Sequence, residues 1–263
     1  MEKFNFKKRY GQNFIKNPII VEKIVEKSQI PEDTLILEVG VGKGILTNEL
    51  IKHGKQVISY EIDTTLKDYL DEKFNNANNL EIIYTDFMER DIIEDINKYE
   101  YKNIYFIANV PYYITTPILM KLMNLNVNVD KIVMMVQKEV GERFNAMPKT
   151  KEYSSLTVLL NYYYDIRKLL NVNKNEFIPV PKVDSVVIAL TRKRDLLEVK
   201  NYDIFYKLIR DSFQFKRKTI RNNLKGYDLT KIEEILLKNN LSLSSRAEEI
   251  SVDVFVQMSN YLS

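Results

Sequence analysis

The stretch LILEVGVGKG, residues 35–44, places a short apolar run directly before three closely spaced glycines. The run is typical of a buried strand, and the residues that follow Gly44 have the apolar spacing of a helix. Because glycine has no Cβ, the backbone of this turn can approach a ligand closely, and a helix N-terminus favours an anionic group such as a carboxylate or phosphate. The stretch therefore predicts a strand, a ligand-binding turn and a helix in succession.

Apolar, β-branched runs alternate with amphipathic stretches through the first two thirds of the chain. The predicted strands are residues 35–39, 56–60, 80–84, 104–108 and 131–137. The predicted helices between them are residues 45–52, 64–74, 91–98 and 117–124. Alternation of this kind predicts an α/β fold, with a doubly wound, mostly parallel sheet that binds ligands at the carboxyl ends of its strands.

The pattern changes after residue 137. A helix is predicted at residues 155–163, and two extended segments, residues 165–172 and 185–192, can pair as an antiparallel edge that completes a seven-stranded sheet. From there to the end of the chain the pattern is helical. Two domains are therefore expected, an α/β domain of residues 1–192 and a small all-α domain of residues 193–263.

The spacing of the glycines separates two kinds of nucleotide cofactor. Dinucleotide-binding loops have the pattern Gly-x-Gly-x-x-Gly, whereas residues 40–44 read Gly-x-Gly-x-Gly. The tighter spacing, with Glu38 shortly before it, resembles the S-adenosylmethionine loop of Rossmann-like class I methyltransferases. The resemblance implies S-adenosylmethionine as the cofactor, with contacts from Gly40, Gly42 and Gly44. A dinucleotide is the alternative.

Acidic and amide side chains follow the next three predicted strands. Glu61 follows the second strand, where a carboxylate can accept both ribose hydroxyls of a nucleoside. Asp86 follows the third strand and can accept a hydrogen bond from the adenine amine of the cofactor. Each residue has a plainer interpretation as the cap of a following helix. Because a glycine loop, Glu61, Asp86 and Asn109 follow four successive strands, a shared ligand site is the better interpretation.

Asn109-Val110-Pro111-Tyr112 follows the apolar run of residues 104–108. The exocyclic amine of adenine is a poor nucleophile because its lone pair is delocalised into the ring. The side-chain oxygen of Asn109 and the carbonyl oxygen of Val110 can accept both amine hydrogens and localise that lone pair. Pro111 stiffens the turn, and Tyr112 offers a face on which a base can stack. The loop is a candidate catalytic site for alkylation of adenine. The alternative is an ordinary Asn-x-Pro turn that ends a strand and has no catalytic role.

Composition excludes several kinds of chemistry. The 263 residues include no cysteine and one histidine, His53, so the chain cannot form a disulfide, a thiolate metal site or a multi-histidine cluster, and no metal is expected. No apolar run approaches transmembrane length, and residues 1–9 lack the apolar stretch of a signal peptide. These features predict residence in the cytoplasm, or in an organelle interior if a targeting segment has been removed.

Basic residues are concentrated near the two ends of the chain, although the net charge is only +3. Residues 1–17 carry five basic side chains and one acidic side chain, and residues 204–226 carry seven and one. Two basic segments suit a polyanion such as RNA, and solvated lysine-rich faces are the alternative. The candidate RNA-binding residues are Lys7, Lys8, Arg9, Lys216, Arg217, Lys218 and Arg221.

Six segments together resemble the ribosomal RNA adenine dimethyltransferase family, most closely its small-subunit enzymes. The likeness runs over almost the whole chain, and Val110, where leucine is frequent in the family, is a mild departure. The segments are residues 9–15, RYGQNFI; residues 40–44, GVGKG; residues 109–118, NVPYYITTPI; residues 177–186, FIPVPKVDSV; residues 215–224, FKRKTIRNNL; and residues 246–251, RAEEIS.

The family resemblance also implies roles for individual residues. The segment around Asn13 and Ile15 is implied to close over the cofactor. Further positions that match cofactor-binding residues are Gly40, Glu61, Asp86 and Asn109. Phe177 matches an aromatic residue that stacks on the target base opposite Tyr112, and each ring can contribute about 1 to 3 kcal/mol by stacking on an extruded adenine. Core packing of Phe177 is the alternative, which its place in a rigid, proline-rich segment disfavours.

The function that the resemblance implies is methylation of RNA. Methyl groups pass from S-adenosylmethionine to the exocyclic amines of two adjacent adenosines near the 3′ end of small-subunit (16S) ribosomal RNA, and the product is dimethyladenosine. The implied partners are ribosomal RNA and the small ribosomal subunit, with a monomeric protein and no membrane. Two alternatives stay open: a large-subunit ribosomal RNA methyltransferase of the macrolide-resistance type, and a non-catalytic RNA-binding factor in ribosome assembly or transcription.

Overall fold

The computed structural model describes residues 14–125 and 127–263, with the backbone alone at Phe14. The contacts within the chain divide it into two compact units. One unit ends at Gly141 and also includes Arg167–Arg192, and the other consists of Glu142–Ile166 and Lys193–Ser263. Among the described residues, no helix combines the length and the apolar composition that a membrane span requires.

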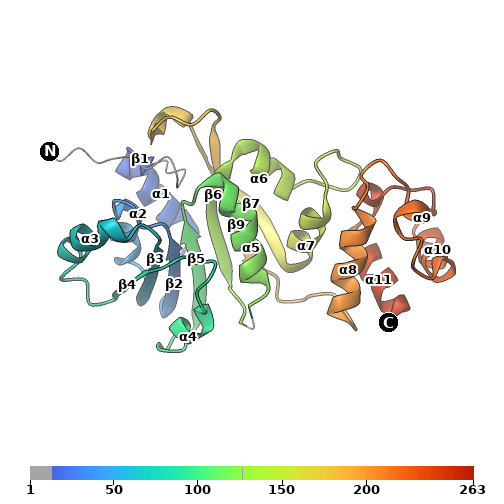
Figure 1. Ribbon diagram of the computed structural model, residues 1–263, viewed down its shortest axis with the longest axis horizontal. Coiled ribbons are helices and arrows are strands. Elements are labelled where there is room, and N and C mark those ends of the chain that lie inside the picture. Colours follow the sequence, from blue (N-terminus) through green and yellow to red (C-terminus); the bar gives the residue numbers. More distant parts are fainter. Residues whose placement is uncertain (1–13, 126) are drawn as a thin grey trace. The chain divides into compact units, whose positions relative to one another are not determined.

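A seven-stranded sheet organises the first unit (Figure 1). In spatial order its strands are β4 (Leu80–Tyr84), β3 (Gln56–Glu61), β2 (Thr34–Val39), β5 (Asn103–Ala108), β6 (Lys131–Gln137), β9 (Ser185–Arg192) and β7 (Tyr164–Val172). The strands from β4 to β6 in this order are parallel to one another, whereas β9 runs antiparallel to β6. The predicted fold class, a doubly wound and mostly parallel seven-stranded sheet, is confirmed.

Helices follow the strands as the alternation predicts. They are α2 (Ile45–Leu50), α3 (Lys67–Lys73), α4 (Ile92–Ile96) and α5 (Thr115–Met123), with the short 3-10 helices η2 (Thr64–Leu66) and η3 (Tyr112–Ile114). Two further helices, α1 (Pro18–Ser28) and α6 (Lys138–Phe144), were not predicted. A local signal starts α1, because the Asn17 side chain accepts a hydrogen bond from the Ile19 amide and Pro18 occupies the first turn.

Both faces of the sheet are covered, since side chains that point to opposite faces are equally buried. On one face, Ile36 of β2 and Ile107 of β5 join residues of α1 and α2 in a hydrophobic cluster. On the other face, Leu37 of β2 and Phe106 of β5 are also fully buried. Because both faces of the sheet are buried, a ligand can reach the sheet only at the loops that follow the strand ends.

A two-stranded antiparallel ribbon contributes to the hydrophobic cluster formed with α1 and α2. It pairs β1 (Phe14–Ile15) with β8 (Phe177–Ile178), so that Ile15 lies opposite Phe177. Ile15 and Phe177 both belong to the hydrophobic cluster with α1, and Phe177 is fully buried. The expectation that Phe177 is unsuited to the core is therefore wrong, because strand pairing satisfies the backbone of this segment and lets the ring pack inward.

The second unit is helical. Its helices are α7 (Ser155–Tyr163), α8 (Tyr202–Ser212), α9 (Ile220–Asn223), α10 (Leu229–Lys238) and α11 (Val252–Leu262), with the 3-10 helix η5 (Ala247–Glu249). Residues 142–166 group with these C-terminal helices, not with the α/β domain to which the sequence assigned them. The physical reason is aromatic packing: the Tyr162 and Phe205 ring centroids are 4.9 Å apart, and the Tyr162 hydroxyl donates to the Leu197 carbonyl oxygen at 2.7 Å.

Candidate active site

Loops at the carboxyl ends of β2, β3, β4 and β5 form the wall of a pocket in the first unit. The predicted site residues that line it are Ile15, Gly40, Gly42, Glu61, Asp86, Asn109, Pro111 and Tyr112. Two others, Gly44 and Phe177, are not in the pocket wall. Four predicted residues lie outside the described part of the chain: Lys7, Lys8, Arg9 and Asn13.

Positive φ angles at three glycines shape the turn after β2. The φ angle is 81° at Gly40, 55° at Gly42 and 68° at Gly44, a region that other residues enter only with strain. Gly40 and Gly42 line the pocket, whereas Gly44 precedes the first residue of α2. A Cβ at Gly44 would lie 2.6 Å from the Phe74 ring. The absence of a Cβ at Gly44 therefore makes room for the Phe74 ring, and the cofactor contact of Gly44 stays a prediction.

Gly44→Ala is expected to lower the free energy of unfolding by roughly 2 to 3 kcal/mol, because alanine is strained at this φ and its methyl group meets the Phe74 ring. Denaturant unfolding followed by circular dichroism measures the change. The matched control is Gly226→Ala, since a Cβ at Gly226 has no atom within 4 Å and its φ is not positive. Equal losses in the two variants would contradict the packing role of Gly44.

Glu38, two residues before Gly40, is a buried carboxyl group that connects three elements. Its Oε2 accepts hydrogen bonds from Ser59 Oγ on β3 at 2.6 Å and from Thr47 Oγ1 on α2 at 2.8 Å. Its Oε1 is buried without a hydrogen-bond partner among the described residues. Burial, opposed in part by the two hydroxyls, raises the pKa of Glu38 to about 7. Glu38 thus ties β2 to the neighbouring strand β3 and to α2, the helix that follows the glycine loop.

Glu61, the last residue of β3, lines the pocket with its carboxylate already oriented. Its Oε2 accepts a hydrogen bond from the Gly42 amide and its Oε1 accepts one from the Asp63 amide, each at 2.8 Å. Burial raises the pKa of Glu61, against the lowering effect of these backbone hydrogen bonds. Because a carboxylate oxygen can accept more than one hydrogen bond, the arrangement fits two neighbouring hydroxyl groups of a ribose.

Asp86 begins the turn after β4, and its Oδ1 accepts a hydrogen bond from the Met88 amide at 2.8 Å. The apolar residues of the pocket wall that were not predicted include Ile62 and Phe87. Each directly follows a strand-end acidic residue, and this repeated acidic-apolar pair is a sequence signal that could have identified them. Apolar side chains beside hydrogen-bonding carboxylates suit an aromatic base with polar edges.

The loop after β5 brings Asn109, Pro111 and Tyr112 to the same pocket. A Cβ at Gly40 would be 3.9 Å from the Asn109 carbonyl oxygen, so this loop and the glycine loop are neighbours. Pro111 has an extended conformation (φ −54°, ψ 138°) that leads the chain into η3. The Tyr112 hydroxyl is hydrogen-bonded to Ser185 Oγ of β9 at 2.8 Å, and burial raises the pKa of Tyr112. Tyr112 is therefore a neutral ring held in place.

Phe177 lies behind the pocket wall. Its partner in the β1–β8 ribbon, Ile15, lines the pocket, whereas the Phe177 ring is fully buried and offers no face to a base. The predicted stacking of a base between Tyr112 and Phe177 is therefore not the arrangement in this structure. The role that its packing supports is to hold Ile15 at the pocket.

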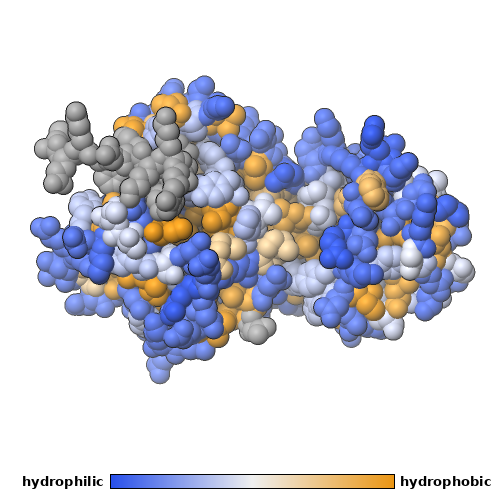
Figure 2. All heavy atoms as spheres, in the orientation of Figure 1, coloured by the Kyte–Doolittle hydropathy of each residue, from blue (hydrophilic) through white to orange (hydrophobic). Residues whose placement is uncertain are grey.

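The basic residues predicted near the C-terminal end are exposed on the second unit. They are Lys216, Arg217, Lys218 and Arg221. Lys216 Nζ donates to the Lys151 carbonyl oxygen at 2.8 Å. The nearby Lys207 and Arg210 instead form ion pairs with Asp211. Hydrophilic side chains cover most of the face drawn in Figure 2. A short segment with four exposed cations can attract a polyanion.

A family model described as Ribosomal RNA adenine dimethylase matches residues 3–263. Among curated proteins, the Ribosomal RNA small subunit methyltransferase A of Macrococcus caseolyticus is 39% identical over 266 residues, covering 98% of this chain and 90% of the relative. The protein of the same name from Staphylococcus haemolyticus is 41% identical over 264 residues, covering 97% of this chain and 89% of the relative.

Two solved structures resemble this chain over nearly its full length. A dimethyladenosine transferase from Plasmodium falciparum has a TM-score of 0.75 and 26% identity, covering 93% of this chain and 95% of the other. The 23S rRNA methyltransferase ErmE has a TM-score of 0.73 and 25% identity, covering 95% and 99%. These likenesses confirm the class I methyltransferase fold with C-terminal helices.

Proposed function

The chain belongs to the ribosomal RNA adenine dimethylase family, and from this premise we propose that it dimethylates two adjacent adenosines near the 3′ end of small-subunit (16S) ribosomal RNA. S-adenosylmethionine is the methyl donor, and the process is ribosome biogenesis. The observation that carries the proposal is a single pocket in which the glycine loop, two strand-end carboxylates and Asn109 meet.

The pocket fits S-adenosylmethionine by its chemistry. When bound, this cofactor supplies a methyl group activated by a sulfonium. Gly40 and Gly42 leave the backbone open to close approach, and Glu61, oriented by two backbone amides, accepts the ribose hydroxyls. Asp86 accepts a hydrogen bond from the adenine amine, and Ile15 adds apolar contact from the pocket wall.

Asn109 and Tyr112 present the target base. The Asn109 side-chain oxygen and the Val110 carbonyl oxygen accept the two amine hydrogens and localise the nitrogen lone pair. Tyr112, held through Ser185, gives the base a stacking face that contributes about 1 to 3 kcal/mol, and Pro111 stiffens the loop. No side chain needs to act as a strong base, because the methylated nitrogen is cationic and loses its proton readily to water.

The same acceptors account for two rounds of transfer. A monomethylated amine still has one hydrogen to donate to Asn109, so it can be held for a second transfer. The dimethylated amine has none, and the finished base therefore loses this contact. Release after the second methylation follows from the hydrogen-bond count alone.

Small-subunit RNA is favoured over large-subunit RNA as the substrate. The two curated relatives named for the small subunit are 39% and 41% identical to this chain, whereas the 23S rRNA enzyme is 25% identical. The test is mass analysis of both RNAs after incubation with the purified protein and S-adenosylmethionine, the small-subunit RNA being supplied in assembled particles. Dimethyladenosine is expected in the small-subunit RNA. Modification of large-subunit RNA alone, or RNA binding without any modification, would favour one of the two alternatives.

We also propose that the protein acts as a monomer in the cytoplasm. The pocket wall is supplied by loops of a single chain, so catalysis does not need a second copy. Light scattering after size-exclusion chromatography, at the concentration used for the methylation assay, is expected to give the mass of one chain. Activity confined to a dimeric fraction would contradict the monomer.

The triple variant Arg217→Ala, Lys218→Ala, Arg221→Ala is expected to weaken RNA binding by roughly 10-fold or more and to lower the salt slope by about 2 to 3, because each lost phosphate contact removes roughly 0.7 to 0.9 from that slope. Binding titrations over a series of salt concentrations measure both quantities. The charge-matched control replaces three exposed lysines outside this segment: Lys23, Lys27 and Lys238. A slope that stays at the wild-type value would mean that the segment is only a solvated face.

A further inference from the structure

We propose that the ion-paired cluster of Arg90 and Asp95, together with Lys121, is a positioning device for the end of the pocket that receives the adenine of the cofactor. The cluster holds the turn of residues 86–90, and with it the Asp86 carboxylate, at the pocket wall. The inference rests on the proposed function, since it takes S-adenosylmethionine as the ligand of this pocket.

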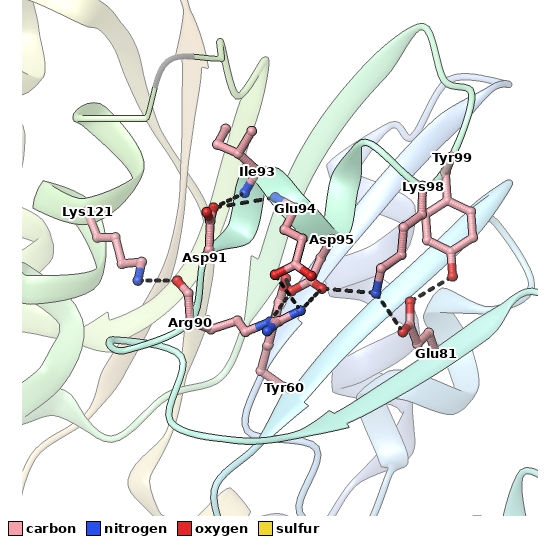
Figure 3. Close-up of polar contacts among 10 residues, drawn as sticks. All are labelled: Tyr60, Glu81, Arg90, Asp91, Ile93, Glu94, Asp95, Lys98, Tyr99 and Lys121. Atoms are coloured by element: carbon pink, nitrogen blue, oxygen red, sulfur yellow. Dashed lines mark hydrogen bonds and ion pairs between the residues drawn. The ribbon is translucent and has the colours of Figure 1, made fainter.

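Asp95 is the centre of the cluster (Figure 3). Its side chain is fully buried, and the Arg90 guanidinium binds it through two hydrogen bonds, from Nε to Oδ2 at 2.9 Å and from Nη2 to Oδ1 at 2.6 Å. Lys98 Nζ donates to Oδ1 at 3.1 Å, and the Tyr60 hydroxyl donates to Oδ2 at 3.1 Å. Burial alone would raise the pKa of Asp95, yet these hydrogen bonds hold it below its ordinary value, so the carboxylate is charged at neutral pH.

The turn of residues 86–90 carries the carboxylate predicted to bind adenine. The Asp86 carbonyl oxygen accepts hydrogen bonds from the amides of Glu89 at 3.1 Å and Arg90 at 3.2 Å. Its side-chain Oδ1 accepts a hydrogen bond from the Met88 amide at 2.8 Å. The Asp86 side chain is thus oriented by the turn that it begins, and a movement of the turn at Arg90 would move this carboxylate relative to the pocket.

Tyr60 connects the cluster to the aromatic part of the pocket wall. Tyr60 and Phe87 both line the pocket, and their rings pack edge to face with centroids 5.1 Å apart. Because the Tyr60 hydroxyl donates to Asp95, one carboxylate holds the ring that supports Phe87 and also, through Arg90, the end of the turn. The polar and the apolar contacts to an adenine are therefore set by the same group.

Lys121 fastens the turn from a different element, α5. Its Nζ donates to the carbonyl oxygens of Met88 at 2.8 Å and Arg90 at 2.7 Å, and it lies 5.4 Å from the centroid of the Phe87 ring. Two carbonyl oxygens bound by one ammonium group restrict how the turn can move. Since α5 follows η3 directly, Lys121 also joins the cofactor side of the pocket to the helix that continues the Asn109 loop.

The need for a defined geometry accounts for this buried charge better than stability does. Replacing a buried ion pair by apolar residues of similar volume is often neutral or stabilising, whereas charge-assisted hydrogen bonds fix direction as well as distance. The cluster also reaches β4, the strand that leads into Asp86. Lys98 Nζ contacts Glu81 Oε1 at 3.2 Å, and the Tyr99 hydroxyl donates to Glu81 Oε2 at 2.7 Å (Figure 3).

Three substitutions test the proposal: Asp95→Asn, Arg90→Lys and Lys121→Met. Asp95→Asn and Lys121→Met are each expected to weaken S-adenosylmethionine binding roughly 10-fold, which is the lower end of the loss seen when a residue that supports a metal ligand is removed. The kcat at saturating cofactor and RNA should stay within about 3-fold of wild type, because none of the three side chains touches the reacting atoms. Arg90→Lys keeps the charge but loses the two-pronged contact, so its effect should be smaller than that of Asp95→Asn.

The discriminating measurement is recognition of the adenine amine. Titration calorimetry compares S-adenosylhomocysteine with its inosine analogue, which carries an oxygen in place of the amine. The wild-type protein is expected to prefer the adenosine compound by at least roughly 10-fold, and the variants should lose most of this preference. A substitution that only destabilises the fold would weaken the binding of both ligands by the same factor. An unchanged ratio in the variants would therefore overturn the proposal.

Asp33→Asn is the matched control. Asp33 is also an ion-paired carboxylate, 3.3 Å from Lys55 Nζ and 2.8 Å from Lys102 Nζ, but it does not line the pocket, so affinity and ratio should stay at wild-type values. If Asp95→Asn does not fold, the same ratio of the two ligand affinities is measured in Arg90→Lys and Lys121→Met. A wild-type protein that binds neither ligand would refute the proposed function, whereas wild-type preference retained in the folded variants would refute the positioning role alone.

Discussion

Asn109→Ala is expected to lower kcat for methyl transfer roughly 100- to 1,000-fold, a loss of about 3 to 4 kcal/mol, because the variant lacks the acceptor that holds the target amine in its reacting orientation. RNA affinity should stay largely intact, since it depends on phosphate contacts made by exposed basic residues such as Arg217 and Arg221. Single-turnover incorporation of labelled methyl groups at saturating cofactor and RNA measures the first quantity, and a binding titration measures the second.

The matched control for this prediction is Asn103→Ala, at the opposite end of the same strand. The Asn103 side chain donates to the Glu32 carbonyl oxygen at 3.5 Å and does not line the pocket, so its removal should leave transfer at the wild-type rate. Equal losses of RNA binding and of transfer in Asn109→Ala would contradict the assigned role. Such a result would place Asn109 in RNA docking, not in the orientation of the amine.

The sheet could be predicted because a parallel strand buried on both faces needs apolar residues at nearly every position. The predicted run at residues 104–108 falls within β5, and the run at residues 131–137 coincides with β6. Once the strand ends are known, the positions of Glu61, Asp86 and Asn109 follow, because neighbouring parallel strands end at one edge of the sheet. In the structure, these three residues line the same pocket, as expected.

The burial of Phe177 and the packing of Phe74 against Gly44 could not be predicted, because the partners of both residues are distant in the sequence. Nothing near Phe177 indicates that it pairs with Ile15, and nothing near Gly44 indicates that the Phe74 ring packs on it. The link between Arg90 and Asp95 is equally hidden, since a spacing of five residues across a turn has no periodic signal. Local pattern shows which residues are apolar or charged, whereas the choice among distant partners is a property of the folded chain.

The domain boundary illustrates the same limit. The helix at residues 155–163 could be predicted with its bounds, since α7 is Ser155–Tyr163. Its apolar spacing shows that one face is buried but does not show against which element. Only the packing of Tyr162 on Phe205 assigns the helix to the second unit, and this contact joins residues of α7 and α8, between which the sequence places the three strands β7, β8 and β9.

The buried carboxyl of Glu38 is expected to make the stability of the protein fall as pH rises through neutrality. In the unfolded chain its pKa is the ordinary value of 4.5, whereas burial raises the pKa to about 7 in the folded protein. Between these two values the folded state binds a proton that the unfolded state has lost. The free energy of unfolding therefore decreases with pH over this window, by about 1.4 kcal/mol per pH unit and about 3 kcal/mol in total.

Glu38→Gln isolates this contribution, because glutamine keeps the shape and can still accept hydrogen bonds from Ser59 and Thr47 but does not titrate. The difference in free energy of unfolding between wild type and variant should change by about 2 to 3 kcal/mol from pH 5 to pH 8, because the stability of the wild type falls relative to that of the variant as pH rises. Denaturant unfolding at a series of pH values measures it. Glu32→Gln, at an exposed position just before β2, is the control and should show a constant difference. A constant difference for Glu38→Gln as well would mean that the carboxyl ionises at its ordinary pKa, and that water or local movement relieves the burial seen around its Oε1.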